Sequence, residues 1–427
     1  MGKSKSYTKK YPVFTEDMKK DYTILIPSML PRHFNIMSGI MRSYGYKTEI
    51  LENMGQSVID EGLKYVHNDT CYPAQLVIGQ MLDALNSGKY DKNKVALMIT
   101  QTGGGCRASN YIHLLRKALE KAGYGYIPVV SLNFSGLEKE SSFKMTPAIL
   151  HKFAYAICYG DLLMTLVNQS KPYEVNKGDS EALASAWTQR LTEEMRRGHL
   201  SKNIAKNNYL LMAEDFAKLE KSGSPKPKVG IVGEIFVKFS PLGNNNLEEF
   251  LISEGAEPVV PGLLDFCLYV IKNALIDREL YGKNKKSAII YKLVLKILCS
   301  LQKDVIEAIK KEGSFNPPLP FELIPPLAEE LIGLGMKMGE GWLLTAEMIQ
   351  LIHEGASNII CTQPFGCLPN HIAGKGMMKP LKEKYPAANI VAIDYDSGAA
   401  KINQENRIKL MLSSAVTKED KRPMFNR

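Results

Sequence analysis

The N-terminal half of the chain alternates short apolar segments with longer segments in which apolar residues recur at helical spacing. The apolar segments are YTILIP (22–27), KTEIL (47–51), KVALMITQ (94–101) and IPVVSL (127–132). Helical patterns lie between them, one in RHFNIMSGIMRSYG and two that begin near residues 71 and 106. Short apolar strands separated by helices of about 10 to 15 residues predict a parallel, doubly wound sheet.

The second half repeats this alternation after a purely helical region. Residues 145–220 show helical patterns only, and a linker rich in Gly, Ser, Pro and Lys follows, KSGSPKPK (221–228). The next strand patterns are VGIVGE (229–234), AEPVVPG (256–262), NIICTQ (358–363) and NIVAID (389–394). We therefore predict an α/β protein with two Rossmann-like or flavodoxin-like parallel-sheet domains and additional helices. The N-terminal domain with its helical extension is expected at 1–225, and the C-terminal domain at 226–427, with a helical insertion at about 263–355.

The length and charge of the chain narrow the class of protein. Its 427 residues suit two domains of ordinary size. The formal charge of +9 is spread over predicted helix faces, and the dense basic runs are MGKSKSYTKK and YGKNKKSAIIYK. Without a nucleic-acid recognition motif, this charge indicates solvated surface that suits an acidic protein partner or an anionic substrate. The chain lacks both an apolar run of roughly 18 residues and a secretion signal. We expect a cytoplasmic protein that binds neither nucleic acid nor membrane.

Three of the seven cysteines stand at the head of a predicted helix. Cys106 lies in ITQTGGGCRASNYIHLLRKAL and Cys367 in NIICTQPFGCLPNHI, so each follows a buried strand and a glycine-containing turn. Cys71, in NDTCYPAQ, heads its own amphipathic helix and follows residues typical of loops and helix caps. Ligands of open α/β sheets bind where the strand-to-helix loops converge, at the carboxyl ends of the strands. Helix N-termini also lower the pKa of a thiol, so we expect thiolates here.

These thiols favour a metal cluster over other uses of cysteine. Without a secretion signal, a disulfide framework is not expected. Cys361, at the end of its strand, is in reach of the same crevice, although the strand would equally bury it. Zinc sites usually draw on C-x2-C or C-x4-C pairs, which this chain lacks, whereas iron–sulfur clusters accept cysteines from distant loops. The alternative is that these are unrelated core or loop cysteines. The remaining three lie in apolar helical patterns typical of cores: Cys158, Cys267 and Cys299.

Other motifs add a few candidates. The chain has neither a G-x-x-x-x-G-K-[ST] phosphate loop nor a G-x-G-x-x-G dinucleotide motif, so any ATP binds to a partner. His371 is a candidate proton donor, or else a first-turn histidine bonded to backbone. Arg107 is a candidate for offsetting negative charge beside Cys106, or else a surface residue. The asparagines of SPLGNNNLEEF (240–250) are candidates for lining a pocket. A Ser-His-Asp or Cys-His hydrolase would need at most one of these thiols. A metal site accounts for several thiols in equivalent loops at once, so we prefer it.

These motifs carry a family resemblance. The chain resembles the cluster-binding component of the 2-hydroxyacyl-CoA dehydratase superfamily, and most closely its double-cubane cluster branch, which also occurs as the C-terminal part of acyl-CoA dehydratase activase fusions. The resemblance covers nearly all of residues 20–412. The stretches that carry it are GLKYVHNDTCYPAQLVIGQ, TQTGGGCRASNYIHLLRKAL, VGEIFVKFSPLGNNNLEEFLISEGAEPVVPGLLDF, CTQPFGCLPNHIAGKGM and NIVAIDYD.

The resemblance implies which residues hold the cofactor. Cys71, Cys106 and Cys367 would be ligands of an iron–sulfur cluster in the interdomain cleft, with Cys361 as a further ligand. The dehydratases hold a [4Fe-4S] cubane with three cysteines per subunit, and the double-cubane proteins hold an [8Fe-9S] assembly with six. If six cysteines hold a cluster in this chain, some of them must come from the three that we assigned above to helical cores.

The resemblance also implies low-potential reduction. A separate homodimeric activator with its own [4Fe-4S] cluster hydrolyses ATP and passes electrons on, and ferredoxin or flavodoxin lies upstream of it. We therefore expect an ATP-dependent reductase subunit, itself a homodimer, that reduces a small-molecule substrate at its cluster. Two alternatives remain: a 2-hydroxyacyl-CoA dehydratase subunit, and a non-catalytic electron relay or cluster carrier.

Overall fold

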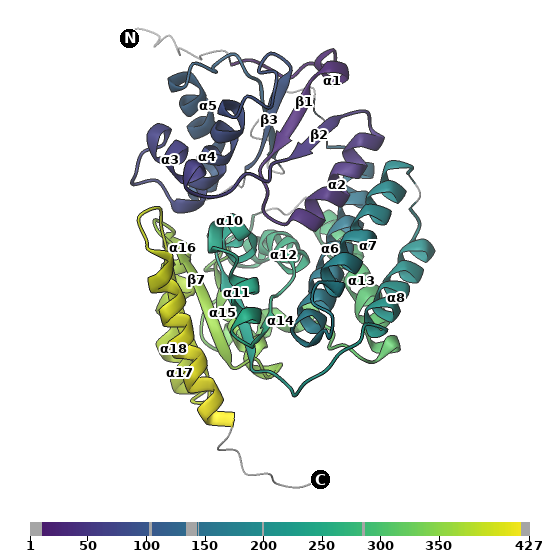
Figure 1. Cartoon of the computed structure of the whole chain (residues 1–427), viewed down its shortest axis with the longest axis vertical. Helices are drawn as coiled ribbons and strands as arrows, with labels where there is room; N and C mark the ends of the chain where they lie inside the picture. Colours follow the sequence, from purple (N-terminus) through teal and green to yellow (C-terminus); the bar gives the residue numbers. More distant parts are fainter. Residues whose placement is uncertain are drawn as a thin grey trace. The chain divides into compact units, whose positions relative to one another are not determined.

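The computed structural model describes residues 11–101, 105–133, 143, 145–198, 200–283 and 287–419 (Figure 1). Its contacts divide the chain into two compact units, and each of them is assembled from separate stretches of sequence. The first unit comprises Met1–Ser28, Tyr44–Thr70 and Ala74–Thr146. The second unit comprises Met29–Ser43, Cys71–Pro73 and Pro147–Arg427.

The first unit is built on a four-stranded, all-parallel sheet with the strand order β2-β1-β3-β4. Figure 1 shows β1, β2 and β3 side by side. The strands are β1 (Thr23–Ile26), β2 (Lys47–Ile50), β3 (Val95–Gln101) and β4 (Val129–Asn133). The helices are α1 (Met18–Asp21), α3 (Gln56–Tyr65), α4 (Tyr72–Asn86, whose first two residues belong to the second unit), η1 (Arg107–Asn110) and α5 (Tyr111–Lys121). Six of the seven residues of β3 are buried, as expected for a central strand covered on both faces.

The second unit contains a second four-stranded parallel sheet, with the order β6-β5-β7-β8. Its strands are β5 (Lys228–Gly233), β6 (Glu257–Val259), β7 (Asn358–Pro364) and β8 (Asn389–Tyr395). The central strand β7 is buried from Ile359 to Pro364 and pairs with β5 and β8 in parallel register. The two sheets therefore share one topology, which confirms the predicted α/β class with two similar parallel-sheet units.

Helices make up most of the second unit. In order they are α2 (Pro31–Ser43), α6 (Pro147–Ser170), η2 (Lys171–Tyr173), α7 (Asp179–Arg196), α8 (Lys202–Ala217), α9 (Ile235–Phe239), α10 (Pro241–Asn244), α11 (Leu247–Ser253), α12 (Leu263–Tyr281), α13 (Ala288–Glu312), η3 (Phe321–Leu323), α14 (Ile324–Glu329), α15 (Trp342–His353), α16 (Leu368–Ala373), η4 (Lys375–Met377), α17 (Met378–Lys384) and α18 (Lys401–Glu419). Helices α6, α7, α8 and α13 pack against one another (Figure 1). The predicted insertion at about 263–355 corresponds to α12 through α15.

The compact units do not coincide with the predicted boundary at residue 225. Helices α6, α7 and α8, which the sequence pattern attaches to the N-terminal domain, group with the second sheet, and so does α2. The physical reason is the apolar character of α6, which is buried along most of its length against α2, α12 and α13. Within the part of the chain that the structure describes, no helix combines the length and apolarity needed to cross a bilayer.

Helix α2 lies close to α7 because a glycine stands at their contact. A Cβ added at Gly39 would collide with the carbonyl oxygen and the methyl group of Thr192. Main chains can approach this closely only where one of them lacks a side chain. Gly39 therefore fixes the distance between α2 and α7, and both helices line the pocket described below.

We predict that Gly39→Ala lowers the free energy of unfolding by about 1–3 kcal/mol, because the new methyl group overpacks the contact with Thr192. Thermal unfolding followed by circular dichroism measures the change. Gly333→Ala is the matched control in the same unit, because nothing lies within 4 Å of a Cβ added there. Equal effects of the two substitutions would contradict the assignment.

Candidate functional site

The carboxyl edge of the second sheet is where its ligands are expected. In the order β6-β5-β7-β8 the chain connections leave β5 and β7 in opposite directions, which opens a crevice between the loops that follow these two strands. The loop after β5 contains Glu234, and the loop after β7 contains Phe365, Gly366 and Cys367. One predicted ligand therefore stands at this switch point.

The structure brings the main chain of Cys71 to the turn that precedes Cys367. The amide of Tyr72 donates a hydrogen bond to the carbonyl oxygen of Phe365 at 3.0 Å. Gly366 has φ +74°, and a Cβ added there would lie 3.0 Å from the Cα of Cys71. Cys71 and Cys367 are buried, with 6% and 7% of their surfaces exposed. Two predicted ligands from opposite halves of the sequence thus belong to one local structure within the second unit.

Cys361 lies deeper, inside strand β7. It is fully buried in an apolar cluster that includes Met348 and Ile349 of α15. Its thiol contacts the side-chain oxygen of Asn370 at 3.5 Å. Burial, together with the negative charge of Asp394, raises the pKa of Cys361 to about 12. Cys361 is therefore a protonated, packed thiol in this environment, and its role as a ligand stays a prediction.

Cys106 belongs to the first unit and follows β3, the strand that corresponds to β7 in the shared topology. It directly precedes η1, which leads into α5, so the cysteine lies between a strand and a helix as predicted. Its carbonyl oxygen accepts a hydrogen bond from the hydroxyl of Ser109 at 2.8 Å. Of the glycines predicted to form this turn, Gly103 and Gly104 lie outside the described residues. The meeting of Cys106 with the cysteines of the second unit stays a prediction.

Arg107 connects the loop before Cys71 with the loop that carries Cys106. Its guanidinium Nη1 donates to the carbonyl oxygen of Asp69 at 2.9 Å, and both residues belong to the first unit. Asp69 precedes Cys71 by two residues, a distance that the chain spans in about 7 Å or less. Arg107 itself directly follows Cys106 and is exposed. The contact fixes the loop before Cys71 to the loop that carries Cys106.

His371, the other residue considered for catalysis, lies in the first turn and a half of α16. Its amide donates to the carbonyl oxygen of Cys367 at 3.2 Å, and the residue is exposed. This helical hydrogen bond is the backbone role considered as the alternative for this histidine. Its role as a proton donor stays a prediction.

The three remaining cysteines lie on helices of the second unit. Cys158 on α6 is 1% exposed, and burial raises its pKa well above the ordinary value. Cys267 on α12 and Cys299 on α13 are partly buried, and burial raises the pKa of each to about 12. Among the described residues, no three His, Cys, Asp or Glu side chains come together as a metal-binding group.

Sequence reasoning missed a pair of carboxylates at the edge of the second sheet. Glu340, directly before α15, accepts a hydrogen bond from the amide of Ile235 at 3.0 Å. Glu234, directly before α9, accepts one from the amide of Val237 at 3.0 Å. Burial raises the pKa of both carboxyl groups, and the charge of Glu340 raises that of Glu234 further. The pair therefore favours holding at least one proton.

This acid pair lies close to the turn that carries Cys367. A Cβ added at Gly339, the neighbour of Glu340, would lie 3.1 Å from the ring of Pro369, which follows Cys367 by two residues. The signal in the sequence was the placement of Glu234 directly after strand β5, at the point where the strand order reverses. No such signal marks Glu340, because its partner lies far away along the chain.

Gln363 is a second residue that sequence reasoning missed. It is the penultimate residue of β7 and only 1% exposed. Its side-chain oxygen has no hydrogen-bond partner among the described residues. Buried polar atoms are nearly always paired, so this oxygen, four residues before Cys367, stands out at this edge of the sheet.

Comparison with models of protein families and with curated proteins finds no match for this chain. The candidate site therefore rests on its own geometry. Its described parts are the joined backbones of Cys71 and Cys367, the acid pair and the unpaired oxygen of Gln363.

We predict that Gly366→Ala destabilises the second unit by more than Gly355→Ala does. Both glycines have positive φ, which costs alanine about 1 kcal/mol or more, but only Gly366 also faces the main chain of Cys71. The additional loss should be about 1–3 kcal/mol, measured by thermal unfolding. Indistinguishable unfolding midpoints of the two variants would disprove the close approach.

The acid pair predicts a pH dependence of stability. The pKa of Glu234 in the folded protein is raised above its ordinary value of 4.5, so its stabilising contribution is complete below that value. The contribution is lost as the pH rises through the higher folded pKa. Glu340→Gln keeps an acceptor for Ile235 but removes the charge that raises the pKa of Glu234. The variant should therefore lose less stability than wild type between about pH 5 and about pH 8.

Unfolding midpoints measured across this pH range test the prediction. Glu383→Gln, which changes an exposed carboxylate of α17, should reproduce the wild-type pH profile. Parallel profiles for Glu340→Gln and wild type would show that the two carboxylates titrate independently.

Proposed function

We propose that this chain is an iron–sulfur protein that receives low-potential electrons from an ATP-hydrolysing activator and reduces a small molecule at its cluster. The observation that carries the proposal is the close approach of Gly366 to Cys71, which joins the backbones beside two predicted ligands.

Cys71, Cys106 and Cys367 would hold the cluster, with Cys361 as a further candidate. Cys71, Cys106 and Cys367 each directly precede a helix, and the unpaired amides of the first turn favour the negative charge of a thiolate. When bound, the cluster would supply one-electron reduction. The chain itself contributes orientation through the hydrogen bond from Tyr72 to Phe365, and a protonated carboxyl through the pair Glu234 and Glu340.

The proposed partners are those that the family resemblance implies: a separate ATP-hydrolysing [4Fe-4S] activator, with ferredoxin or flavodoxin upstream of it. The lack of a phosphate-binding loop in this sequence agrees with that division of labour. The net charge of +9 suits docking of an acidic partner. We propose a cytoplasmic homodimer. Turnover of substrate with activator, ATP and reductant separates this reductase from a passive electron relay, and a requirement for a CoA thioester would identify a dehydratase instead.

We predict that Cys71→Ser, Cys106→Ser and Cys367→Ser each reduce bound iron to less than about half of the wild-type content, because a neutral hydroxyl replaces a thiolate ligand. Anaerobic iron and sulfide analysis with absorbance spectroscopy measures the loss. About 4 or about 8 iron atoms per wild-type chain distinguishes the [4Fe-4S] from the [8Fe-9S] cluster.

Cys299→Ser, on helix α13, should leave the iron content unchanged if the cluster is a [4Fe-4S] cubane, whereas loss of iron would show that an [8Fe-9S] assembly recruits this thiol. Cys361→Ser decides the role of the buried thiol, since loss of iron identifies a ligand and retention identifies a core residue. Wild-type protein without iron after anaerobic reconstitution would refute the proposed function, as would retention of iron in the first three variants.

A further inference from the structure

A pocket of about 860 Å³ lies wholly among residues of the second unit. Its walls come from α2, α6 and α7, and from the turns around α9, α10 and α11. Asn244 and Asn246 of SPLGNNNLEEF line it, so the pocket-lining role predicted for these asparagines is confirmed for two of the three. A volume of this size is typical of small-molecule sites. Nothing in the proposed iron–sulfur chemistry uses this pocket.

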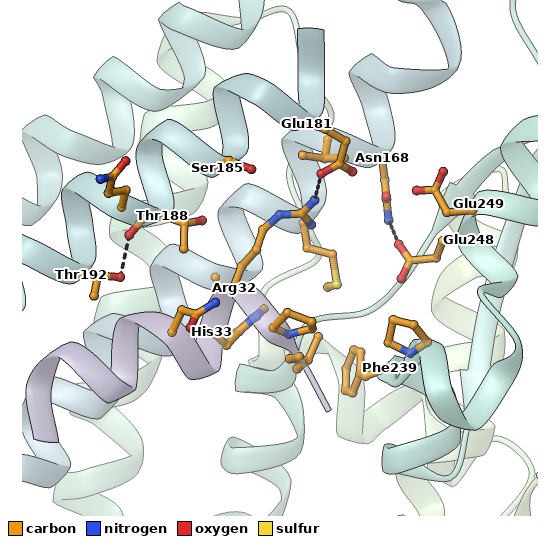
Figure 2. Close-up of a pocket in the computed structure, with 18 of the residues that line it drawn as sticks. Arg32, His33, Asn168, Glu181, Ser185, Thr188, Thr192, Phe239, Glu248 and Glu249 are labelled. Carbon is orange, nitrogen blue, oxygen red and sulfur yellow. Dashed lines mark hydrogen bonds and ion pairs between the residues drawn. The ribbon is translucent and has the colours of Figure 1, made fainter. Parts of the chain in front are cut away.

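One end of the pocket gathers three carboxylates around two cations. Glu181 accepts from Arg32 at 2.5 Å and from Lys171 at 3.0 Å. Lys171, just outside the pocket lining, also pairs with Glu249. Figure 2 shows the side chains of Glu181, Glu248 and Glu249 on one side of the pocket, near the end of Arg32. Both cations are thus paired with Glu181 or Glu249, and none is paired with Glu248 among the described residues.

Glu248 is the carboxylate left without a cationic contact. Its Oε2 accepts a hydrogen bond from the amide of Asn168 at 2.7 Å, and no Lys, Arg or His among the described residues forms an ion pair with it. Burial raises the pKa of Glu248, whereas the hydrogen bond from Asn168 and the positive charge of Arg32 lower it, and the charges of Glu249 and Glu181 raise it by smaller amounts. A cation placed beside it would relieve both the burial cost and this repulsion.

The other charged groups lie at the far end of the pocket. Arg42 is ten residues beyond Arg32 on α2, about 15 Å along the helix axis. Glu193 is held by Arg196 through two hydrogen bonds of 2.7 Å and by Arg197 through one more. Neither Arg42 nor Arg196 forms an ion pair with Glu248 in the part of the chain that the structure describes.

The walls between the two ends differ in chemistry. Hydroxyl groups of Ser185, Thr188 and Thr192 occupy one side in Figure 2. Met164 and Phe239, which belong to a buried apolar cluster, occupy another. A ligand with one polar cationic end and an apolar body matches this combination. A polyanion such as a CoA thioester does not, because the cations near Glu248 are already engaged by carboxylates.

We propose that this pocket binds a small organic amine, whose ammonium group pairs with Glu248 while its apolar body lies against Met164 and Phe239. The inference does not depend on the iron–sulfur assignment. It can be tested on the purified full chain whether or not that chain carries a cluster.

The test is isothermal titration calorimetry with phenethylamine, 2-phenylethanol and 3-phenylpropionate. These probes share an aromatic body and differ in the charge of their polar end. Phenethylamine should bind at least about tenfold more tightly than either of the others, because a charge-assisted hydrogen bond to the partly buried carboxylate of Glu248 is lost in both. Glu248→Gln retains an acceptor for Asn168 and should remove this preference.

Two further variants make the result specific. Glu193→Gln removes a carboxylate at the far end and should change phenethylamine affinity less than about threefold. Arg32→Met removes a neighbouring cation and should strengthen phenethylamine binding, a direction that local unfolding cannot produce. Preference for the alcohol or the carboxylate, unchanged amine affinity in Glu248→Gln, or no amine binding at millimolar concentration would each overturn the proposal.

Discussion

The close approach between Gly366 and the main chain of Cys71 is the constraint on which the candidate site depends. A side chain at position 366 would meet the Cα of Cys71, and the positive φ of the turn independently favours glycine. Because Tyr72 is also bonded to Phe365, the start of α4 is held by the turn after β7. The local geometry of Cys71 is thus set by the second sheet, although most of α4 belongs to the first unit.

The second unit contains glutamate side chains in two different environments. At the carboxyl edge of its sheet, Glu234 and Glu340 each accept a hydrogen bond from a backbone amide, and burial raises the pKa of both. In the pocket between helices, Glu248 has a single amide donor and unfilled space beside it. The same residue type therefore serves different chemistry, and the difference lies in what surrounds each carboxylate.

The strands and their parallel order were predictable from the sequence, because buried central strands are continuous apolar runs bounded by turn residues. The short helix α3 was not predicted. The division of the long helical insertion into separate helices, α12 to α15, was not predicted either. The grouping of α2 with α7 depends on the contact of Gly39 with Thr192, which no local pattern encodes. The sequence indicated Cys367 and Cys71 through their positions before helices, but the pairing of Glu234 with Glu340 arises only when distant loops meet.

The second unit is discontinuous in sequence, and this affects its biosynthesis. Helix α2 leaves the ribosome long before α6 and α7, the helices that cover Ile36 and Ile40. At typical elongation rates roughly ten to thirty seconds separate these events. During that interval the nascent chain carries an uncovered apolar helix on the polypeptide that is completing the first sheet. Chaperone engagement of the emerging chain is thus favoured at this stage, and neither half of the gene encodes a self-sufficient second unit.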